Sequence, residues 1–500
     1  MSFSLLYSRA RIGLDAPLVM IEVHVSGGLP HFAIAGLAET AVKESKHRVR
    51  SALLHSQFEF PAGRITVNLA PADLPKEGGR FDLPIALGIL AATQQIPAHH
   101  FSEYEFAGEL GLSGDLRAIT ASLPFALQTQ QAQRKLILPC VNAEEASLSN
   151  CALYPAKHLL EVSSHFSKPS LALYNQKQLH ARRTYPVDFS EVIGQAQAKR
   201  ALEIAASGGH HLLMLGPPGT GKTMLAERLP SILPPMNRQA SIEVMAIHSI
   251  SQRKTAVQTW GIRPFRSPHH TASGVALVGG GSDPKPGEIS LAHHGVLFLD
   301  ELPEFNRKVL ETLREPLESG KINIARAANT VQYPARFQLL CAMNPCPCGY
   351  LGTPAQACRC TSEQVLRYQN KISGPILDRI DLHVQVTATP AHIFFKPQTS
   401  AENSTTIRAR VCKAADAALS RAGSLNAQLS HTQLKNVCKL DTRTEQWLEH
   451  ALTQFNLSNR AYHKILKVSR TIADLADAAT IQLEHVQEAL AYRGQMGRKI

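Results

Sequence analysis

The sequence has no apolar run long enough to cross a membrane. A spanning helix needs about 20 apolar residues, whereas the best candidate, Leu83 to Ala92, is much shorter and contains Pro84 and Gly88. The stretch from Met1 to Gly13 has only a short apolar patch and no small-residue cleavage site, so no secretion signal is expected. We therefore expect a cytoplasmic protein without a membrane partner, whose nine cysteines are thiols or metal ligands rather than disulfides.

Acidic and aromatic residues are also relatively few. The chain of 500 residues has 52 Lys+Arg against 40 Asp+Glu, a net charge of +12, and only 6% aromatic residues. A basic excess of this size favours a polyanionic partner such as nucleic acid. The hydrophobic share of 44% and the charged share of 18% are ordinary for globular proteins and exclude wholesale disorder and fibrous folds.

The chain divides into three parts joined by two polar linkers. Residues 1–165 alternate short apolar runs with turns, which is typical of an α+β domain. Residues 188–386 alternate strand-like runs with glycine turns and helices, which predicts a parallel α/β sheet. Residues 405–500 have helical apolar spacing throughout and predict an all-α domain. The stretches 166–187 and 387–404 are the predicted linkers.

The strongest motif is a glycine-rich loop between an apolar strand and a helix, which fits the pattern G-x-x-x-x-G-K-[ST]. It consists of Gly216, Pro217, Pro218, Gly219, Thr220, Gly221, Lys222 and Thr223. Its glycines let backbone N–H groups converge on phosphate oxygens at the start of the helix. Lys222 is expected to reach the β- and γ-phosphates and the Thr223 hydroxyl to bind Mg²⁺. The loop therefore predicts ATP and Mg²⁺ as cofactors.

Polar residues follow two further strands of the same region. A continuous apolar run over 296–299 ends in Asp300 and Glu301, and the carboxyl ends of parallel strands are where such sheets bind ligands. Asp300 is expected to hold Mg²⁺, and Glu301 to polarise the water that attacks the γ-phosphate. Asn344 follows a third strand and is a candidate to orient that water.

Two arginines are candidates for an arginine finger, a guanidinium that one subunit supplies to its neighbour's γ-phosphate. Arg379 lies in the segment LDRID, where an ion pair with Asp378 or Asp381 is the alternative interpretation. Arg314 is the rival candidate.

A helix predicted after the N-cap residue Ser458 carries a basic stripe. Arg460, Lys464 and Lys467 recur at a spacing that places them on one helix face. Arg460 is a candidate to face nucleotide, whereas the two lysines are expected to form a solvated face rather than a DNA site.

Taken together, these motifs resemble those of the magnesium-chelatase-like AAA+ ATPases, and most closely the ComM/YifB branch, the bacterial competence helicases. The matching segments, in chain order, are GPPGTGKT, VLFLDE, MNPCPCGY, SGPILDRIDLHV and SNRAYHKILKVSRTIADL. The resemblance implies a homohexameric ring with nucleotide between subunits and a helical lid. It also implies that Asn344 is sensor 1, Arg379 the finger supplied in trans, and Arg460 sensor 2.

The same resemblance implies two insertions that engage DNA in the pore of the ring. The segment Gly261–Ala292 occupies the position of the helix-2 insert, and Lys321–Phe337 that of the pre-sensor-1 hairpin. The candidate DNA-contacting residues are Arg263, Arg266, His269, His270, Lys321 and Arg326. Six copies around a channel would form a positive collar that binds phosphates without reading sequence. The alternative is a pair of solvated surface hairpins.

The N-terminal part resembles the Lon-type proteolytic fold in the segments 75–82 and 107–112. Lon proteases need a serine nucleophile and a lysine base, but Arg80 stands where the serine is expected. No lysine occurs between Lys76 and Lys135, where the base should fall. Because acyl transfer then lacks its starting groups, we expect no peptidase activity, and a ring-assembly or DNA-guiding role instead.

Four cysteines form the pattern C-x-C-x₉-C-x-C over 346–360. They are Cys346, Cys348, Cys358 and Cys360. Four thiolates this close together can surround a tetrahedral Zn²⁺ ion, although zinc sites more often use C-x₂-C spacing. The alternative is a group of reduced cysteines, without metal, in a tight turn after Asn344.

The sequence thus predicts an ATP-dependent hexameric DNA translocase or helicase. The resemblance implies branch migration during recombination of incoming DNA in natural transformation, with single-stranded and branched DNA and recombination proteins as partners. The rival hypothesis is a protein-remodelling or metal-insertion ATPase of the magnesium-chelatase type, since that enzyme uses the same engine on partner proteins.

Overall fold

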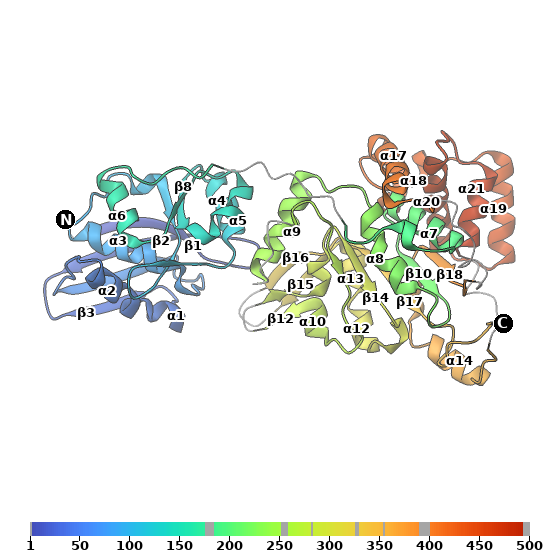
Figure 1. Ribbon diagram of the computed structural model, residues 1–500, viewed down its shortest axis with the longest axis horizontal. Helices are drawn as coiled ribbons and strands as arrows, with labels where there is room; N and C mark the ends of the chain where they lie inside the picture. Colours follow the sequence, from blue (N-terminus) through green and yellow to red (C-terminus); the bar gives the residue numbers. More distant parts are fainter. Residues whose placement is uncertain are drawn as a thin grey trace. The chain divides into compact units, whose positions relative to one another are not determined.

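The computed structural model describes residues 3–175, 185–251, 259–281, 284–325, 330–353, 356–389 and 401–493. They form two compact units, which Figure 1 shows coloured along the chain. The first comprises Met1–Arg182 and Arg238–Trp260, and the second comprises Arg183–Asn237 and Gly261–Ile500. No helix in the described ranges is long and apolar enough to cross a membrane.

The first unit is built on a four-stranded sheet in the order β1-β2-β4-β3. Its strands are β1 (Phe3–Arg9), β2 (Leu18–Ser26), β3 (His31–Ala35) and β4 (Arg64–Ala70). Helix α3 (Asp82–Ala92) packs on β1 and β2. Every residue of α3 is buried, which explains why the longest apolar run of the chain is a core helix rather than a membrane span. Gly88 lies where an added Cβ would be 2.5 Å from Val23, so this glycine permits close packing.

A second, parallel sheet of the first unit has the order β5-β8-β9. Its strands are β5 (Tyr104–Phe106), β8 (Lys135–Pro139) and β9 (Leu153–Ala156), and a small hairpin joins β6 (Glu109–Leu110) to β7 (Leu116–Arg117). The other helices are α1 (Thr40–Lys43), α2 (Ser45–His55), α4 (Ser122–Gln131), α5 (Ala143–Ala146), α6 (Leu159–Ser167) and α9 (Arg238–Ile250). Helix α9 comes from the chain region after the phosphate loop, yet it packs on α4 through Met245 and Ala246.

The second unit contains the parallel five-stranded sheet that the sequence predicts, in the order β11-β14-β17-β10-β18. Its strands are β10 (Leu212–Leu215), β11 (Phe265–Arg266), β14 (Val296–Leu299), β17 (Gln338–Met343) and β18 (Leu382–Gln385). Helices α7 (Ala196–Gly208) and α8 (Lys222–Ile232) pack against it. Leu215 is paired with Met343, and Leu299 with Cys341, so the strands before the three candidate site segments end at one edge.

Two hairpins lie between the strands of this sheet in the sequence. One joins β12 (Gly279–Gly280) to β13 (Lys285–Pro286), and the other joins β15 (Lys321–Ala325) to β16 (Thr330–Pro334). The hairpin predicted over 321–337 therefore forms, but its tip with Arg326 lies outside the described residues. The Tyr333 hydroxyl donates to the Pro284 carbonyl at 2.7 Å, so the two hairpins are fastened together. The short helices of this unit are α10 (Gly274–Val278), α11 (Glu288–Leu291), α12 (Arg307–Glu311), α13 (Arg314–Ser319), α14 (Ser362–Gln369) and α15 (Gly374–Leu377).

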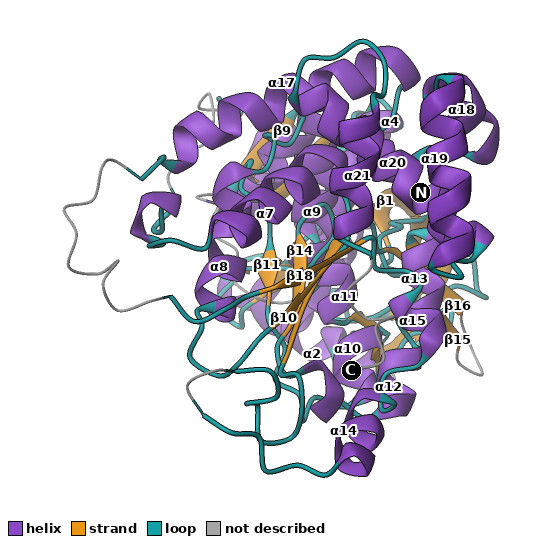
Figure 2. Cartoon of the chain, turned by 90° about the vertical axis from the view of Figure 1, so that its right-hand side faces the viewer, coloured by secondary structure: helices purple, strands orange, loops and turns teal. Residues whose placement is uncertain are grey.

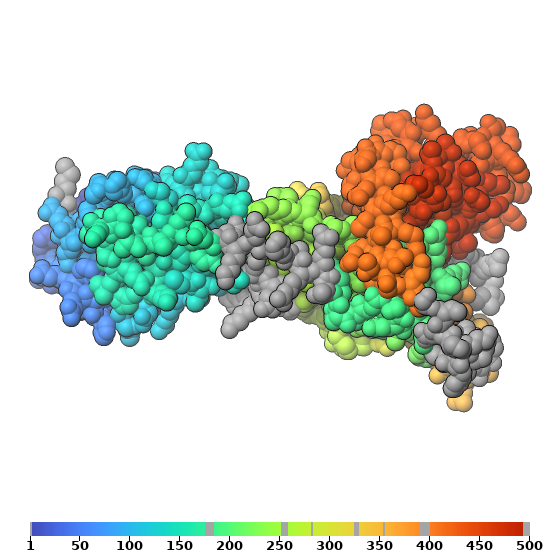
Figure 3. All heavy atoms as spheres, turned by 45° about the horizontal axis from the view of Figure 1, so that its top comes forward, coloured from blue at the N-terminus to red at the C-terminus, as the bar shows by residue number. Residues whose placement is uncertain are grey.

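The C-terminal region is helical, as predicted: Figure 2 labels its helices, and in Figure 3 its atoms form one orange-to-red group. They are α17 (Ser404–Ala422), α18 (His431–Val437), α19 (Thr442–Gln454), α20 (Asn459–Leu475) and α21 (Leu483–Ala491). The predicted cap at Ser458 is confirmed, because its hydroxyl accepts from the Ala461 backbone N–H. Apolar residues of these helices share one core with α7, α8 and the sheet.

Candidate functional site

Lys222 is held at the carboxyl edge of the sheet by three oxygen acceptors. Its ammonium donates to the carbonyls of Gly216 at 2.7 Å and Pro217 at 2.8 Å, and to the Asn344 side-chain oxygen at 3.1 Å. Because burial disfavours the charged form, the pKa of Lys222 is lowered, although Asp300 and Glu301 partly oppose this effect. The loop thus presents a desolvated cation next to Asn344, so two of the candidate site residues from the sequence lie in direct contact.

Thr223 and Asp300 meet directly at this edge. The Thr223 hydroxyl donates to an Asp300 carboxylate oxygen at 2.7 Å. A hydroxyl and a carboxylate, both hard oxygen ligands beside a phosphate loop, match the protein ligands that Mg²⁺ uses together with phosphates. These two residues therefore fit the predicted magnesium site, where the ion would neutralise charge on the phosphates.

Glu301 adjoins that pair, because its backbone N–H donates to the other Asp300 carboxylate oxygen at 2.9 Å, and its backbone is strained. Its φ is +51°, a left-handed conformation that is uncommon for residues with side chains and clusters at functional sites. Its half-exposed carboxylate lies 3.2 Å from Nδ1 of His270. His270, a predicted DNA-contacting residue, is thus next to the carboxylate that is expected to activate water.

Gln195, the last residue of the segment Phe189–Gln195 that resembles a conserved family box ahead of the phosphate loop, contacts that loop. Its side-chain amide donates to the Thr220 carbonyl at 3.3 Å and to the Thr387 carbonyl at 2.7 Å, and so links the loop to the end of β18. A pocket of about 340 Å³ lies beside it, lined by Gly194, Ala196, Lys199, Arg200, Glu203, Glu402, Ile407 and Arg410.

The two finger candidates differ in how they are held. Arg379 donates to the Pro375 carbonyl at 2.6 Å and forms an ion pair with Glu318 of α13, rather than with Asp378 or Asp381, the two partners considered from the sequence. Arg314 forms a 3.0 Å ion pair with Glu311 and keeps about half of its side chain exposed. Both arginines bind acidic groups of their own chain, so either would have to exchange that partner for a phosphate.

The basic stripe on α20 is not a solvated face. Lys464 is largely buried and pairs with Asp381 at 2.7 Å, while Lys467 donates to the Ala427 carbonyl. The prediction for the two lysines was wrong because their partners are distant in the sequence. Asp381 immediately precedes β18. The Lys464 pair therefore anchors α20 at the amino-terminal ends of the strands, whereas the phosphate loop lies at their carboxyl ends. Arg460 is exposed on the first turn of that helix.

The predicted DNA-contacting residues fall into two groups. The Arg263 guanidinium is buried and donates to the carbonyls of Pro234 and His294, and Arg266 lies on the edge strand β11, where it pairs with Glu288. These two side chains thus make part-buried contacts with other groups of the same chain. By contrast, Lys321 is exposed on β15, and the exposed His269 bonds to Thr271.

The four cysteines predicted as ligands converge on one point. Their sulfur atoms all lie within 4.8 Å of one another, and Cys346 is 3.3 Å from Cys348 and 3.6 Å from Cys358. These separations exceed the 2.05 Å of a disulfide and approach the spacing of about 3.8 Å between sulfurs in a tetrahedral zinc site. Backbone N–H groups of Tyr350 and Arg359 lower the pKa of Cys348 to about 6 and so favour its thiolate form. Burial and the neighbouring sulfurs raise the pKa of Cys358 to about 12 and raise that of Cys360.

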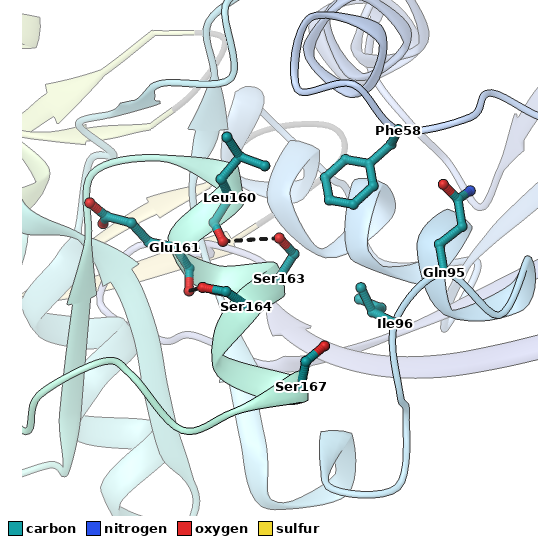
Figure 4. A pocket seen from close by; sticks show the side chains of 8 residues that line it. All are labelled: Phe58, Gln95, Ile96, Leu160, Glu161, Ser163, Ser164 and Ser167. Atoms are coloured by element: carbon teal, nitrogen blue, oxygen red, sulfur yellow. Dashed lines mark hydrogen bonds between the residues drawn. The ribbon is translucent and has the colours of Figure 1, made fainter.

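In the first unit, neither position 80 nor the serine-containing pocket described below pairs a serine with a lysine or histidine base. Arg80 is buried and its guanidinium contacts Thr120. A pocket of about 520 Å³ lies elsewhere, lined by Phe58, Gln95, Ile96, Leu160, Glu161, Ser163, Ser164 and Ser167. Figure 4 shows that the hydroxyls of Ser163 and Ser164 donate to carbonyls of their own helix. No lysine or histidine is among the residues that line this pocket.

Three family models match successive segments of the chain. The model described as "Magnesium chelatase, subunit ChlI" matches residues 188–393. "Subunit ChlI of Mg-chelatase" matches residues 21–142, and "Magnesium chelatase, subunit ChlI C-terminal" matches residues 401–493.

Individual relatives agree with these matches. "Competence protein ComM" of Haemophilus influenzae is 51% identical over 503 residues, which cover 99% of this chain and 98% of the relative. The protein YifB of Escherichia coli is 48% identical over 498 residues, with 99% and 97% covered. "Lon protease 2" of Bacillus subtilis is 27% identical over 149 residues, or 28% of this chain and 27% of the protease.

Proposed function

Because the chain belongs to the ComM/YifB branch of the magnesium-chelatase-like AAA+ ATPases, we propose that it is a ring-forming motor that uses ATP hydrolysis to move DNA. The observation that carries the proposal is the convergence of Lys222, Asn344 and the Thr223–Asp300 pair at the ends of three adjacent strands. In this arrangement Lys222 binds the phosphates, and Glu301 accepts a proton from water that Asn344 orients. Arg379 or Arg314 reaches the nucleotide of the neighbouring subunit in a hexamer.

The hairpins β12–β13 and β15–β16, joined by the Tyr333–Pro284 hydrogen bond, support DNA as the substrate. Hydrolysis alters the contacts of Asp300 and Glu301, which directly follow β14, and the chain continues from there through α12 and α13 to β15. Asn323 of β15 donates to Glu315 of α13 at 2.7 Å, so a shift of α13 would move the hairpin. Lys321 on its exposed face would then carry phosphates through the pore, and the net charge of +12 fits such a partner. By analogy with the relative named as a competence protein, the DNA would be incoming single-stranded or branched DNA during natural transformation, and the reaction branch migration with recombination proteins.

We expect branched and single-stranded DNA to accelerate ATP turnover by the full chain, and Lys321→Ala to weaken this stimulation at every DNA sequence tested. The variant removes a phosphate contact, so the dependence of DNA binding on salt should also become shallower. Lys308→Ala, which removes an exposed lysine of α12, is the matched control and should behave as wild type. A rate of ATP hydrolysis that does not change when DNA is added would refute the proposal. It would favour the second candidate, a protein-remodelling or metal-insertion ATPase, which the match to the chelatase family model supports.

We also propose that the cysteine cluster binds Zn²⁺. Protein purified without chelator should contain about one zinc per chain, since four thiolates complete a structural site. Cys358→Ser should lose the metal, whereas Cys140→Ser, which changes a cysteine outside the cluster, should retain it. Metal analysis by mass spectrometry is the measurement, and a wild-type protein with little or no zinc contradicts this assignment.

A further inference from the structure

The loop between the cysteines lies directly against the phosphate loop. A Cβ added to Gly349 would lie 2.6 Å from Cδ and 3.2 Å from Cγ of Pro218, and 3.8 Å from Cγ of Asn344. Real Cβ atoms do not approach other atoms so closely, so glycine at 349 lets the two loops touch. Gly349 follows Cys348, which links one thiol of the cluster to the middle of the phosphate loop.

A second connection runs through the chain itself. Cys346 is the second residue after Asn344, whose side chain accepts a hydrogen bond from Lys222. The intervening Pro345 carbonyl accepts from the Gln369 side chain at 3.1 Å, and the Asn344 backbone is bonded to Tyr368 of the same helix, α14. The cysteine cluster is therefore next to Asn344, one of the three acceptors of Lys222, and to Pro218, which directly follows another of them.

We propose that the cysteine cluster, when it holds its metal, is a clamp that positions Pro218 and Asn344 for nucleotide binding. This inference rests on the zinc assignment made above. Four ligands close the loop 346–360 at both ends and fix Gly349 against Pro218. Without metal, four separate thiols impose no such constraint, because the free energy of metal binding is what orders a small site of this kind. Gly349 is thus a positioning residue that acts through the phosphate loop.

Two glycines of the same loop provide a matched test. Gly349 has φ +84° and Gly352 has φ +75°, so alanine meets similar backbone strain at both positions. Nothing lies within 4 Å of a Cβ at Gly352, whereas at Gly349 the Cβ overlaps the Pro218 ring, which cannot move without the phosphate-loop backbone. Gly349→Ala and Gly352→Ala therefore differ mainly in whether the cysteine loop pushes on the phosphate loop.

The experiment measures zinc content and the affinity for a fluorescent ATP analogue, without DNA, in wild type and both variants. We expect all three proteins to retain zinc, and Gly349→Ala to bind the analogue about tenfold or more weakly, because small misplacements of a binding group are costly. Gly352→Ala should bind as wild type. Removal of zinc from wild type should weaken binding to a similar extent, and zinc added back should restore it.

Several outcomes would overturn the clamp. They are a wild type without metal, equal binding by the two glycine variants, or undiminished binding after zinc removal. Lys222→Ala sets the value for a damaged phosphate loop. If wild type binds the analogue no better than Lys222→Ala does, the proposed ATP site itself has failed. Because the measurement uses no DNA, failure of the DNA-motor proposal leaves this result unaffected.

Discussion

Lys222→Ala should lower the rate of ATP hydrolysis by about 100- to 1,000-fold, the loss typical when one preorganised electrostatic contact is removed from an active site. In the structure the ammonium is desolvated and bound by two carbonyls and the Asn344 side chain. Phosphate oxygens are stronger acceptors than these neutral groups, so nucleotide binding exchanges weak partners for charged ones. The variant should therefore lose affinity as well as turnover.

Glu301→Gln should separate binding from hydrolysis at the same site. The amide keeps the size of the side chain but cannot accept a proton, so turnover should fall by about 100-fold or more while ATP affinity stays near that of wild type. The change also alters the contact with His270, but both side chains are partly exposed and exposed polar contacts of this kind contribute little to stability.

Glu304→Gln and Lys371→Ala are the matched controls for these two variants. Glu304 and Lys371 pair with each other at 3.2 Å, and each keeps nearly half of its side chain exposed. Steady-state kinetics with and without DNA, together with analogue binding, check the four proteins. Normal turnover by Glu301→Gln would remove this carboxylate from the mechanism, and an equal loss in Glu304→Gln would show that the effect is not specific to position 301.

The sequence predicted well which candidate residues lie at the carboxyl edge of the sheet, because the sequence patterns that identify them are local. The phosphate loop is one continuous motif, and the polar residues at 300, 301 and 344 each follow an apolar strand. Once parallel strands are assigned, their carboxyl ends must lie at one edge, and Thr223 does meet Asp300 there. The cap at Ser458 was predictable for the same reason, whereas the hairpin over 321–337 was expected from the family resemblance.

Features that depend on partners far away in the sequence could not be predicted. Arg266 looks like an exposed basic residue until its strand joins the sheet and Glu288 pairs with it. The Tyr333–Pro284 bond between the two hairpins carries no sequence pattern. Helices α17, α18 and α19 lie between Asp381 and Lys464 in the sequence. Helical spacing alone therefore predicted a solvated lysine and gave no sign of this partner.

The Lys464–Asp381 pair supports the second prediction with a large effect: Lys464→Ala should lower the free energy of unfolding by about 3–5 kcal/mol, the range for removing one partner of a buried ion pair. Asp381 is buried, and its other contacts are the His211 backbone N–H at 3.0 Å and the His210 ring at 3.6 Å. Without the ammonium, its charge would lack a full counterion. Denaturant unfolding of the full chain measures the loss.

Lys413→Ala is the matched control for this variant. Lys413 also pairs with an aspartate of the lid, Asp477, at 2.7 Å, but both side chains are about 70% exposed. Exposed pairs contribute about 0–1 kcal/mol, so this variant should stay close to wild type. Equal losses of unfolding free energy in the two variants would mean that burial does not increase the contribution of the Lys464–Asp381 pair to stability. In the double variant Lys464→Met/Asp381→Asn, which removes both charges, most of the loss should be recovered.

The pH dependence of stability distinguishes an electrostatic anchor from simple packing. Burial alone would raise the pKa of Asp381, but Lys464 and His210 outweigh it and hold this pKa well below its ordinary value. The unfolded chain therefore takes up a proton at higher pH than the folded chain does. The stabilisation is present above the unfolded pKa of about 3.9 and is lost as pH falls below it. In Lys464→Met the folded pKa rises towards or above the unfolded one, so the acid-dependent loss should become smaller. An unchanged slope of unfolding free energy against pH would show that α20 is held to β18 by its apolar contacts alone.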